Sequence, residues 1–390
     1  ASASLQCLNL RYKASTIQSI PYVMRCTIVK ITKIEAGKIS IPLKVPFITA
    51  LRRVDTAEDL VIKVHTDDGA IGWGSAPATV VITGDSHASV AAAIKEVMAP
   101  QLIGLDIDDR EEILARISRS MAHNTSAKAA LDIAVHDLFC QHYGLPLYRF
   151  FGGLRTRIAS DLTISLNDPE TMVRHALAAV QRGYTSLKIK VGTDAALDIR
   201  RVQAVRHAVG PDVAIRLDAN QGWKAKEAVR TIRRLEDLDL GIEFIEQPVA
   251  ARDLDGLKFV TDHVATDIMA DEAAFSPYDV FQLLSRHACD LLNIKLMKAG
   301  GLQAAAQIAA LAGACGVTCM MGCMLESKIG ITAAASLSAG TPVITLNDLD
   351  AADLMAADPV SGGIVYDGNE LCLPDAPGLG IADVAGWEAW

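Results

Sequence analysis

Three carboxylates that end successive apolar runs have the chemistry of a divalent-metal site. Asp218, Glu246 and Asp271 stand 28 and 25 residues apart (246−218 and 271−246), in the runs VAIRLDAN, GIEFIEQP and DIMADEA. A parallel β/α barrel repeats its strands at about this spacing and directs the strand ends to one mouth. A single strand-end acid is usually a turn former or a helix cap, but three acids at one mouth would repel one another without a cation. Oxygen ligands favour Mg²⁺, with Mn²⁺ as second choice, and zinc is disfavoured because no His or Cys joins the group.

Three lysines in other apolar runs have the chemistry of bases beside such a metal. Lys188 and Lys190 in SLKIKVG share one strand parity, so their side chains face the same side, and Lys295 lies in LLNIKLMK. A lysine on an internal strand is costly to bury unless it has a partner or a task; a solvated strand edge is the alternative.

Lysines on the second and sixth strands of a barrel face each other across its mouth. Partial burial beside a cation would lower the pKa of each ammonium group towards neutrality. Such a pair predicts removal of the proton α to a carboxylate and its return on the opposite face, through an enediolate that the metal stabilises. This reaction is a racemisation or an epimerisation. A Schiff-base aldolase would also use a barrel lysine, but it would need neither three acids nor a second lysine.

The elements that must position these residues begin at Arg157, where strand-like and helical runs start to alternate. Eight strands with intervening helices favour a (β/α)-barrel, a modified TIM barrel of the (β/α)7β type, over an open doubly wound sheet. No G-x-G-x-x-G or G-x-x-x-x-G-K-[ST] motif follows a strand, which argues against nucleotide-binding alternatives. The predicted strands are 158–164, 185–191, 213–218, 242–246, 267–271, 289–296, 317–322 and 343–348, and the predicted helices are 168–182, 194–209, 224–238, 251–264, 277–287, 301–315 and 328–339.

A smaller α+β unit precedes the barrel. We expect it to consist of strands over 26–40 and 59–66, a proline-containing loop (IPLKVPFITALRRVD) between them, and helices over 86–118 and 124–143. The expected domain order is a leader or disordered tail (1–23), an α+β capping domain (24–150), the catalytic barrel (151–358) and a segment that returns to the capping domain (359–390).

Bulk composition excludes several partners. The net charge of −9 over 390 residues argues against nucleic acid and anionic membranes. The uncharged run 302–325 is long enough to cross a bilayer, but glutamines and glycines divide it into a helix and a buried strand. Eight cysteines without a C-x-x-C pair indicate reduced thiols in an intracellular, cytoplasmic protein. The acid-free, basic leader 1–23 leaves organelle import as an alternative, and a homo-oligomer is left open.

Five ordered motifs resemble one known family over the chain from Met24 onwards. SLKIKVG, RLDANQGW, EFIEQP, MADEA and NIKLMKAGG resemble the enolase superfamily, muconate lactonising enzyme subgroup. The resemblance implies a capped barrel in which the three strand-end acids bind Mg²⁺. It also implies that Lys190 and Lys295 are the two acid/base groups. Lys188 would tune Lys190 by repulsion and help to neutralise the substrate carboxylate.

Three segments resemble the dipeptide epimerase branch of that family and imply expectations about the substrate. Asp348 and Asp350 in NDLD resemble acids that hold the α-ammonium group of a dipeptide; capping of the next helix is the alternative. The segment PFITALRRVD resembles the mobile capping loop of L-Ala-D/L-Glu epimerases, and SAPATVVITGDS (75–86) resembles their second capping loop. Phe47 would pack over the substrate and Arg52 would pair with a glutamate side chain, unless Arg52 and Arg53 are plain surface charge. Thr163 is expected to donate a hydrogen bond to the substrate.

The sequence therefore predicts an isomerase, a Mg²⁺-dependent dipeptide epimerase of the L-Ala-D/L-Glu type. Its substrate would be L-Ala-L-Glu or L-Ala-D-Glu, epimerised by two-base 1,1-proton transfer at the α-carbon of the C-terminal residue. N-succinylamino acid racemase and o-succinylbenzoate synthase are alternatives that need no ammonium site. A non-catalytic barrel relative is the alternative from a different class.

Overall fold

The structure, a computed structural model, describes residues 28–390, so the leader predicted at 1–23 lies outside the described residues. Within that range no helix is long and apolar enough to cross a membrane. All six cysteines of the described residues are free thiols, as the absence of paired cysteine motifs predicts.

The capping unit is a four-stranded antiparallel sheet covered by helices, with strand order β17-β1-β2-β3. Helix α4 packs closely on β3 because glycines face it: a Cβ atom on Gly74 would lie 2.0 Å from the carbonyl oxygen of Ala130. The single helix predicted over 86–118 is wrong, since the helix breaks after Leu102, where Gly104 takes a φ of +90° that favours glycine. The elements are β1 (Ile31–Ile48), β2 (Arg53–Thr66), β3 (Ile71–Pro77), β17 (Glu388–Ala389), α1 (His87–Ala92), η1 (Ala93–Met98), α2 (Ala99–Leu102), η2 (Ile107–Asp109), α3 (Arg110–Arg119), α4 (Thr125–His142) and α5 (Leu147–Phe150).

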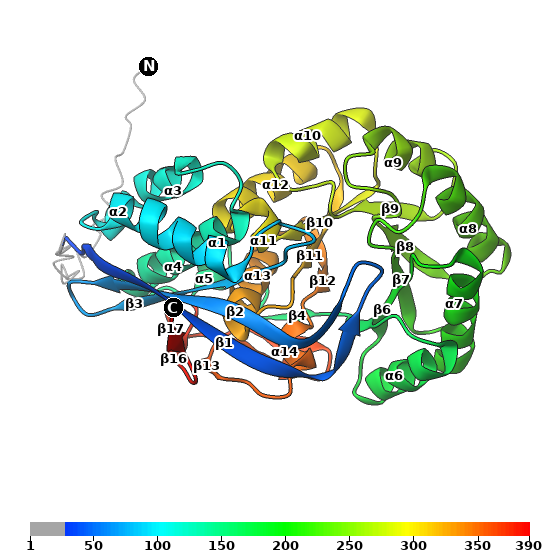
Figure 1. The fold of residues 1–390 in the computed structure, drawn as a ribbon, viewed down its shortest axis with the longest axis horizontal. Helices are drawn as coiled ribbons and strands as arrows, with labels where there is room; N and C mark the ends of the chain where they lie inside the picture. Colours follow the sequence, from blue (N-terminus) through cyan, green and yellow to red (C-terminus); the bar gives the residue numbers. More distant parts are fainter. Residues whose placement is uncertain (1–27) are drawn as a thin grey trace, which may run out of the picture.

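Strands β1 and β2 form a long hairpin that reaches from the capping unit over the barrel (Figure 1). The loop predicted over residues 41–55 is wrong, because most of this segment is paired strand and only 49–52 turns. Pairing runs to Pro42 opposite Thr56 and resumes at Phe47 opposite Val54 after a register shift. A proline donates no backbone hydrogen bond, and an irregular stretch of this kind accommodates it without breaking the hairpin.

Eight parallel strands in sequence order form the barrel, from β5 to β12. The backbone N–H of Asp161 donates to Asn347 O at 3.1 Å, which brings the first and last strands together, so the barrel is nearly closed. The strand predicted over 158–164 is two strands, because β4 (Arg157–Ala159) pairs antiparallel with β15 and only β5 joins the barrel. The barrel strands are β5 (Leu162–Ile164), β6 (Ser186–Lys190), β7 (Ala214–Asp218), β8 (Ile242–Glu246), β9 (Asp267–Ala270), β10 (Leu291–Lys295), β11 (Thr318–Gly322) and β12 (Ile344–Asp348).

Helices surround the barrel, and the last segment of the chain returns to the capping sheet. Strand β17 pairs with β1 through Gly37 opposite Ala389, and the Trp387 indole donates to the Val61 carbonyl oxygen at 3.1 Å. The helices are α6 (Pro169–Gln181), α7 (Ala195–Val209), α8 (Ala225–Asp237), α9 (Leu254–Thr261), α10 (Pro277–Arg286), α11 (Leu296–Ala299), α12 (Leu302–Ala314), α13 (Lys328–Gly340) and α14 (Ala351–Leu354), and the last strands are β13 (Val360–Gly362), β14 (Val365–Asp367), β15 (Glu370–Cys372) and β16 (Ile381–Val384).

Candidate active site

The acids and lysines singled out in the sequence lie at the carboxyl ends of neighbouring barrel strands. The parallel register places Lys190 beside Asp218 and Asp218 beside Glu246. Asp271 follows β9 directly, Lys295 ends β10, and Asp348 ends β12. Parallel strands that end in register direct these side chains to one edge, so the barrel brings together groups that are far apart in the sequence.

Lys188 is the buried centre of this group. Its Nζ lies 3.1 Å from Asp218 Oδ2, 2.7 Å from Glu246 Oε2 and 2.7 Å from Asp348 Oδ2. Burial alone would lower the pKa of this ammonium group, but Asp348, Glu246 and Asp218 raise it well above its usual value. Lys188 therefore stays charged and acts as a fixed positive charge beneath the mouth.

Two further lysines stand above Lys188 and each contacts one acid. Lys190 Nζ is 2.6 Å from Asp218 Oδ2 and lies 5.7 Å from the centre of the Phe47 ring. Lys295 Nζ is 2.7 Å from Asp271 Oδ2. The lowering expected beside a bound cation stays a prediction: with Asp271 as its partner, burial lowers the pKa of Lys295, but Asp271 overcomes burial and raises it above its usual value.

The pKa values of the acids report how crowded the negative charge is. Burial acts to raise the pKa of Asp218, but Lys190 and Lys188 lower it to about 2. Burial and the neighbouring Asp218 raise the pKa of Glu246 to about 8, and burial with Asp271 raises that of Glu272 to about 7. Nearby lysines also overcome burial and lower the pKa values of Asp271 and Asp348, so these three aspartates are held ionised while Glu246 and Glu272 are driven towards the protonated form.

These side chains fit a divalent cation, although they are not arranged around one point. Among residues 28–390, no three Asp, Glu, His or Cys side chains form a ready metal cage, and the Lys188 ammonium lies among the acids instead. All the candidate donors are carboxylate oxygens, as Mg²⁺ prefers. Glu246 Oε2 is buried and accepts no well-aligned hydrogen bond, and the Lys188 ammonium group lies 2.7 Å from it where a cation could bind. The group also has six buried carboxylates and four buried ammonium groups, a formal excess of two negative charges (6−4). The acids are Asp218, Glu246, Asp271, Glu272, Asp348 and Asp350, and the lysines are Lys188, Lys190, Lys295 and Lys298.

A pocket opens directly above this group. Met324 and Leu325, which follow β11, form part of its apolar wall. The metal-binding candidates and Lys188 lie beneath the pocket surface rather than on it. Of the residues predicted from the sequence, its lining includes Phe47, Arg52, Thr163, Lys190, Lys295, Asp348 and Asp350.

Asp350 contacts the barrel rather than the helix that it precedes. Its Oδ2 accepts a 2.6 Å hydrogen bond from the backbone N–H of Thr163 and makes no side-chain cap on α14. The helix-capping alternative is therefore wrong for Asp350. Burial and Asp348 raise its pKa to about 7. A cationic group placed beside these two acids would favour their ionised forms.

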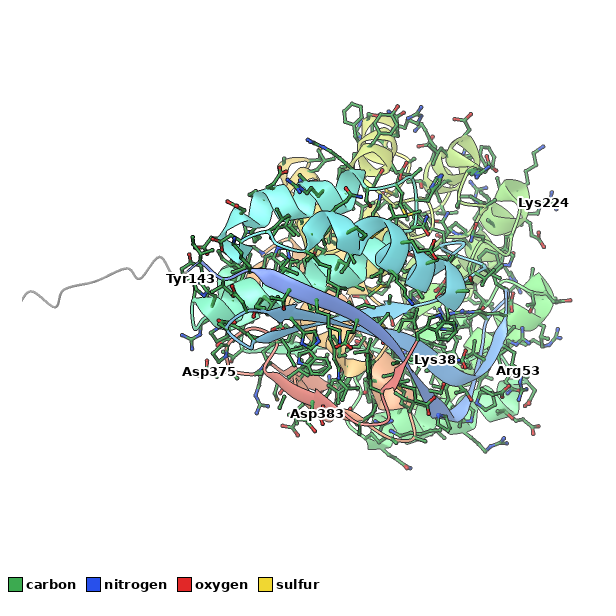
Figure 2. All side chains as sticks on the ribbon, turned by 60° about the vertical axis from the view of Figure 1, so that its left-hand side comes forward. Lys38, Arg53, Tyr143, Lys224, Asp375 and Asp383 are labelled. Atoms are coloured by element: carbon green, nitrogen blue, oxygen red, sulfur yellow. The ribbon has the colours of Figure 1, made fainter. Side chains whose placement is uncertain are left out.

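The two arginines of the hairpin have different environments. Arg53 lies at the surface (Figure 2), and its Nη2 lies 2.9 Å from Asp55 Oδ1. The Arg52 guanidinium lines the pocket, and burial lowers its pKa. Within the described part of the chain no carboxylate pairs with Arg52. The surface-charge alternative therefore describes Arg53, whereas Arg52 is free to pair with an anion in the pocket.

Four polar residues that the sequence reasoning missed support the site. Asn220 Nδ2 donates to Asp218 Oδ2 and to Glu272 Oε1, both at 3.2 Å. Asn293 Nδ2 donates to Glu246 Oε1 at 2.8 Å. All four lie close in sequence to predicted site residues, so proximity along the chain could have identified them. Asn220 and Asn293 stand two residues from Asp218 and Lys295, respectively. Glu272 adjoins Asp271, and Lys298, which binds the Asp271 carboxylate, follows Lys295 by three residues.

Comparison with known proteins agrees with this geometry. Residues 171–383 match the model for the enolase C-terminal domain-like family, and residues 32–152 match that for the mandelate racemase/muconate lactonizing enzyme N-terminal domain. An L-Ala-D/L-Glu epimerase of Clostridium acetobutylicum is 48% identical over 91% of this chain and 99% of its own.

Two solved structures carry the same arrangement of the chain. A substrate-liganded L-Ala-D/L-Glu epimerase from Bacillus subtilis is 50% identical, with a TM-score of 0.90 over 91% of this chain and 99% of that one. A dipeptide epimerase from Enterococcus faecalis V583, complexed with Mg and the dipeptide L-Leu-L-Tyr, is 41% identical, with a TM-score of 0.88 over 91% of this chain and 100% of that one.

Proposed function

The chain belongs to the mandelate racemase/muconate lactonizing enzyme family of the enolase superfamily, and from this premise we propose that it is a Mg²⁺-dependent dipeptide epimerase. It is an isomerase that acts on amino acid derivatives. We further propose that an acidic dipeptide, L-Ala-L-Glu or L-Ala-D-Glu, is its substrate.

The charge balance of the site carries this proposal. The excess of two negative charges among the buried acids equals the net charge that the reacting groups would bring. A divalent cation (+2), an α-ammonium group (+1) and an α-carboxylate (−1) sum to +2. A side-chain carboxylate would be balanced separately by Arg52. This balance counts every group as ionised; a bound cation and ammonium group would favour the ionised forms of Glu246, Glu272 and Asp350, whose pKa values crowding and burial raise.

We assign the cation to Asp218, Glu246 and Asp271. When bound, Mg²⁺ would supply positive charge that stabilises the enediolate form of the substrate. The three acids would then share their negative charge between the cation and the lysines. Asp271 would therefore raise the pKa of Lys295 by less.

The chain's own residues would carry the proton. Lys190 on β6 and Lys295 on β10 both line the pocket, so each can reach a carbon placed between them. One lysine would remove the α-proton of the C-terminal residue and the other would return a proton to the opposite face. Lys188, held by three carboxylates, would stay charged throughout and help to neutralise the substrate carboxylate.

The remaining pocket residues would choose the substrate. Asp348 and Asp350 would bind the α-ammonium group, and Arg52 would bind the side-chain carboxylate. Phe47 would cover the reacting carbon and exclude water. Thr163 would act through its backbone N–H, which orients the Asp350 carboxylate. N-succinylamino acids carry no ammonium group and would leave the two acids uncompensated, so we place that class second.

The decisive experiment is a proton-exchange assay with a dipeptide library. Dipeptides are incubated in D₂O with Mg²⁺, and ¹H NMR follows loss of the α-proton signal of the C-terminal residue. We expect exchange and epimerisation in both stereochemical directions, fastest for L-Ala-L-Glu and L-Ala-D-Glu. No Mg²⁺-dependent exchange with any dipeptide would contradict the proposal and favour a non-catalytic barrel relative.

We also propose a cytoplasmic location. The six free thiols among residues 28–390 support a reducing compartment. The relatives named above are bacterial proteins, which gives organelle import no support. A homo-oligomer remains a proposal that size measurement in solution would test.

A further inference from the structure

Asp353 is a largely buried carboxylate that the proposed chemistry does not use. Its side chain is 10% exposed, and its Oδ2 accepts hydrogen bonds from the Tyr184 hydroxyl at 2.9 Å and from the Arg182 guanidinium. Lys44 Nζ lies 3.4 Å from Oδ1 and donates to the backbone carbonyl oxygen of Asp353 at 2.5 Å. Burial would raise the pKa of Asp353, but Arg182 and Tyr184 lower it, so the carboxylate stays ionised.

The segment that holds Asp353 also holds the proposed ammonium site. Helix α14 is four residues long and directly follows Asp350, so Asp350 and Asp353 stand one helical turn apart. The Thr163 N–H fixes Asp350 on the inner side, towards the pocket. Arg182 and Tyr184 fix Asp353 on the outer side. The segment is therefore fastened to the barrel at both faces.

The capping hairpin rests on this same segment. The N–H of Ala356 donates to Pro42 O at 2.8 Å, and Leu43 forms an antiparallel bridge with Met355. Figure 1 shows the hairpin passing beside α14 on its way to the barrel mouth. Between Pro42 and Phe47 the β1–β2 register is interrupted, so the ladder with β2 does not hold this stretch regularly. Contacts with the α14 segment hold it instead.

We propose that Asp353 is a positioning residue that fixes the capping hairpin, through Lys44, to the segment carrying the ammonium-binding acids. Phe47, which would cover the substrate, and Arg52, which would bind its side chain, are thereby held in place relative to Asp348 and Asp350 in the same pocket. This Lys44–Asp353 contact, the latch, would therefore tune affinity and selectivity rather than the proton transfer. This inference rests on the proposed function, since it assigns those residues to substrate recognition.

Lys44→Glu tests the latch with little risk to folding, because the Lys44 side chain is 51% exposed. The new carboxylate would repel Asp353. Lys44→Arg keeps the charge and serves as the conservative variant. Arg53→Glu is the matched control: it makes the same charge reversal on the same hairpin at an exposed position (Figure 2), and it breaks a pair with Asp55 that does not involve Asp353.

Hydrogen exchange followed by mass spectrometry reads the latch without any substrate. In Lys44→Glu we expect amides of the hairpin tip, residues 42–54, to exchange about three- to tenfold faster, since a weak local contact sets a local opening equilibrium. Arg53→Glu and Lys44→Arg should exchange like the wild type. Equal exchange in Lys44→Glu and wild type, or equal acceleration in Lys44→Glu and Arg53→Glu, would overturn the proposal. Hydrogen exchange does not depend on catalysis, so it tests the latch even if the protein epimerises no dipeptide.

Kinetics supply the second readout. Lys44→Glu should raise KM for L-Ala-L-Glu about three- to tenfold, with kcat within about twofold, because Lys190 and Lys295, which would carry the proton, belong to the barrel strands and not to the hairpin. Adding Asp353→Asn to Lys44→Glu removes the repulsion and should recover part of the KM increase. Additive effects of the two substitutions, or a loss confined to kcat, would show that Asp353 is only structural.

Discussion

The Lys188 ammonium group lies 2.7 Å from the Asp348 carboxylate and so joins the second barrel strand, β6, to the last, β12, which lies on the other side of β5. Lys188 also contacts Asp218 and Glu246. One fixed positive charge therefore stands between the acids that we assign to the cation and those that we assign to the substrate ammonium group. An electrostatic change at either place therefore alters the field at the other.

Removing either proposed base should stop epimerisation but leave α-proton exchange of one of the two epimers. In Lys295→Ala and in Lys190→Ala we expect kcat for epimerisation to fall at least about 10³-fold, because each direction needs both groups. Each variant should still exchange the α-proton of the epimer that faces its remaining lysine, seen by ¹H NMR in D₂O. Full epimerisation by Lys295→Ala would refute the two-base assignment.

Asp350→Asn should separate dipeptides from substrates without an ammonium group. The substitution removes a buried charge that we assign to the α-ammonium group, and we expect kcat/KM for L-Ala-L-Glu to fall about 10- to 100-fold. Turnover of an N-succinylamino acid, if any, should not fall. Equal losses for both substrates would point to a structural role through the bond with the Thr163 N–H.

Arg52→Met should change side-chain preference rather than catalysis. We expect kcat/KM for L-Ala-L-Glu to fall about 10- to 100-fold, whereas that for L-Ala-L-Leu should stay the same or rise, since only the acidic side chain loses a charged partner. Arg53→Met is the control, because Arg53 pairs with Asp55 at the surface. A similar loss for both dipeptides would remove Arg52 from the specificity site.

Mg²⁺ binding should depend on pH through Glu246. Its raised pKa of about 8 means that the cation must displace a proton at neutral pH. Affinity measured by titration calorimetry should weaken as pH falls below 8, by up to about tenfold per unit for one displaced proton. Chelation should abolish α-proton exchange, and Mg²⁺ should raise the melting temperature of the wild type but not of Glu246→Gln. A pH-independent affinity would show that Glu246 is not a ligand.

Asp137 should make stability depend on pH far from the mouth. Its carboxylate accepts from the N–H groups of Trp73 and Leu379 at 2.9 and 2.7 Å, and burial raises its pKa from 3.8 to about 6. The protonated form is thus favoured by folding, so this stabilisation is complete below pH 3.8 and is lost as pH rises through 6. The difference in free energy of unfolding between wild type and Asp137→Asn should shrink by on the order of 2 kcal/mol from pH 4 to pH 7. Urea unfolding at both pH values measures it, and a constant or growing difference would contradict the prediction.

Local patterns in the sequence were enough to predict the barrel and the chemistry at its mouth. Parallel strands end in register, so acids and lysines at regular strand ends must meet at one edge whatever the loops do. Local parity likewise placed Lys188 and Lys190 on the same side. The two missed asparagines, Asn220 and Asn293, could have been predicted in the same way, since each lies two positions from a predicted site residue.

Features that depend on residues distant in the sequence could not be predicted from local patterns and are seen only in the folded structure. The segment 41–55 is a hairpin rather than a loop because β2 and the α14 segment contact it. Arg52 lines the pocket whereas Arg53 pairs with Asp55 at the surface, because the hairpin turn directs the two side chains differently. The pKa of Lys295 rises because Asp271, 24 residues away in sequence, lies 2.7 Å from it. Burial and charge pairing fall steeply with distance in space, and distance in space is fixed by long-range packing that a local pattern does not contain.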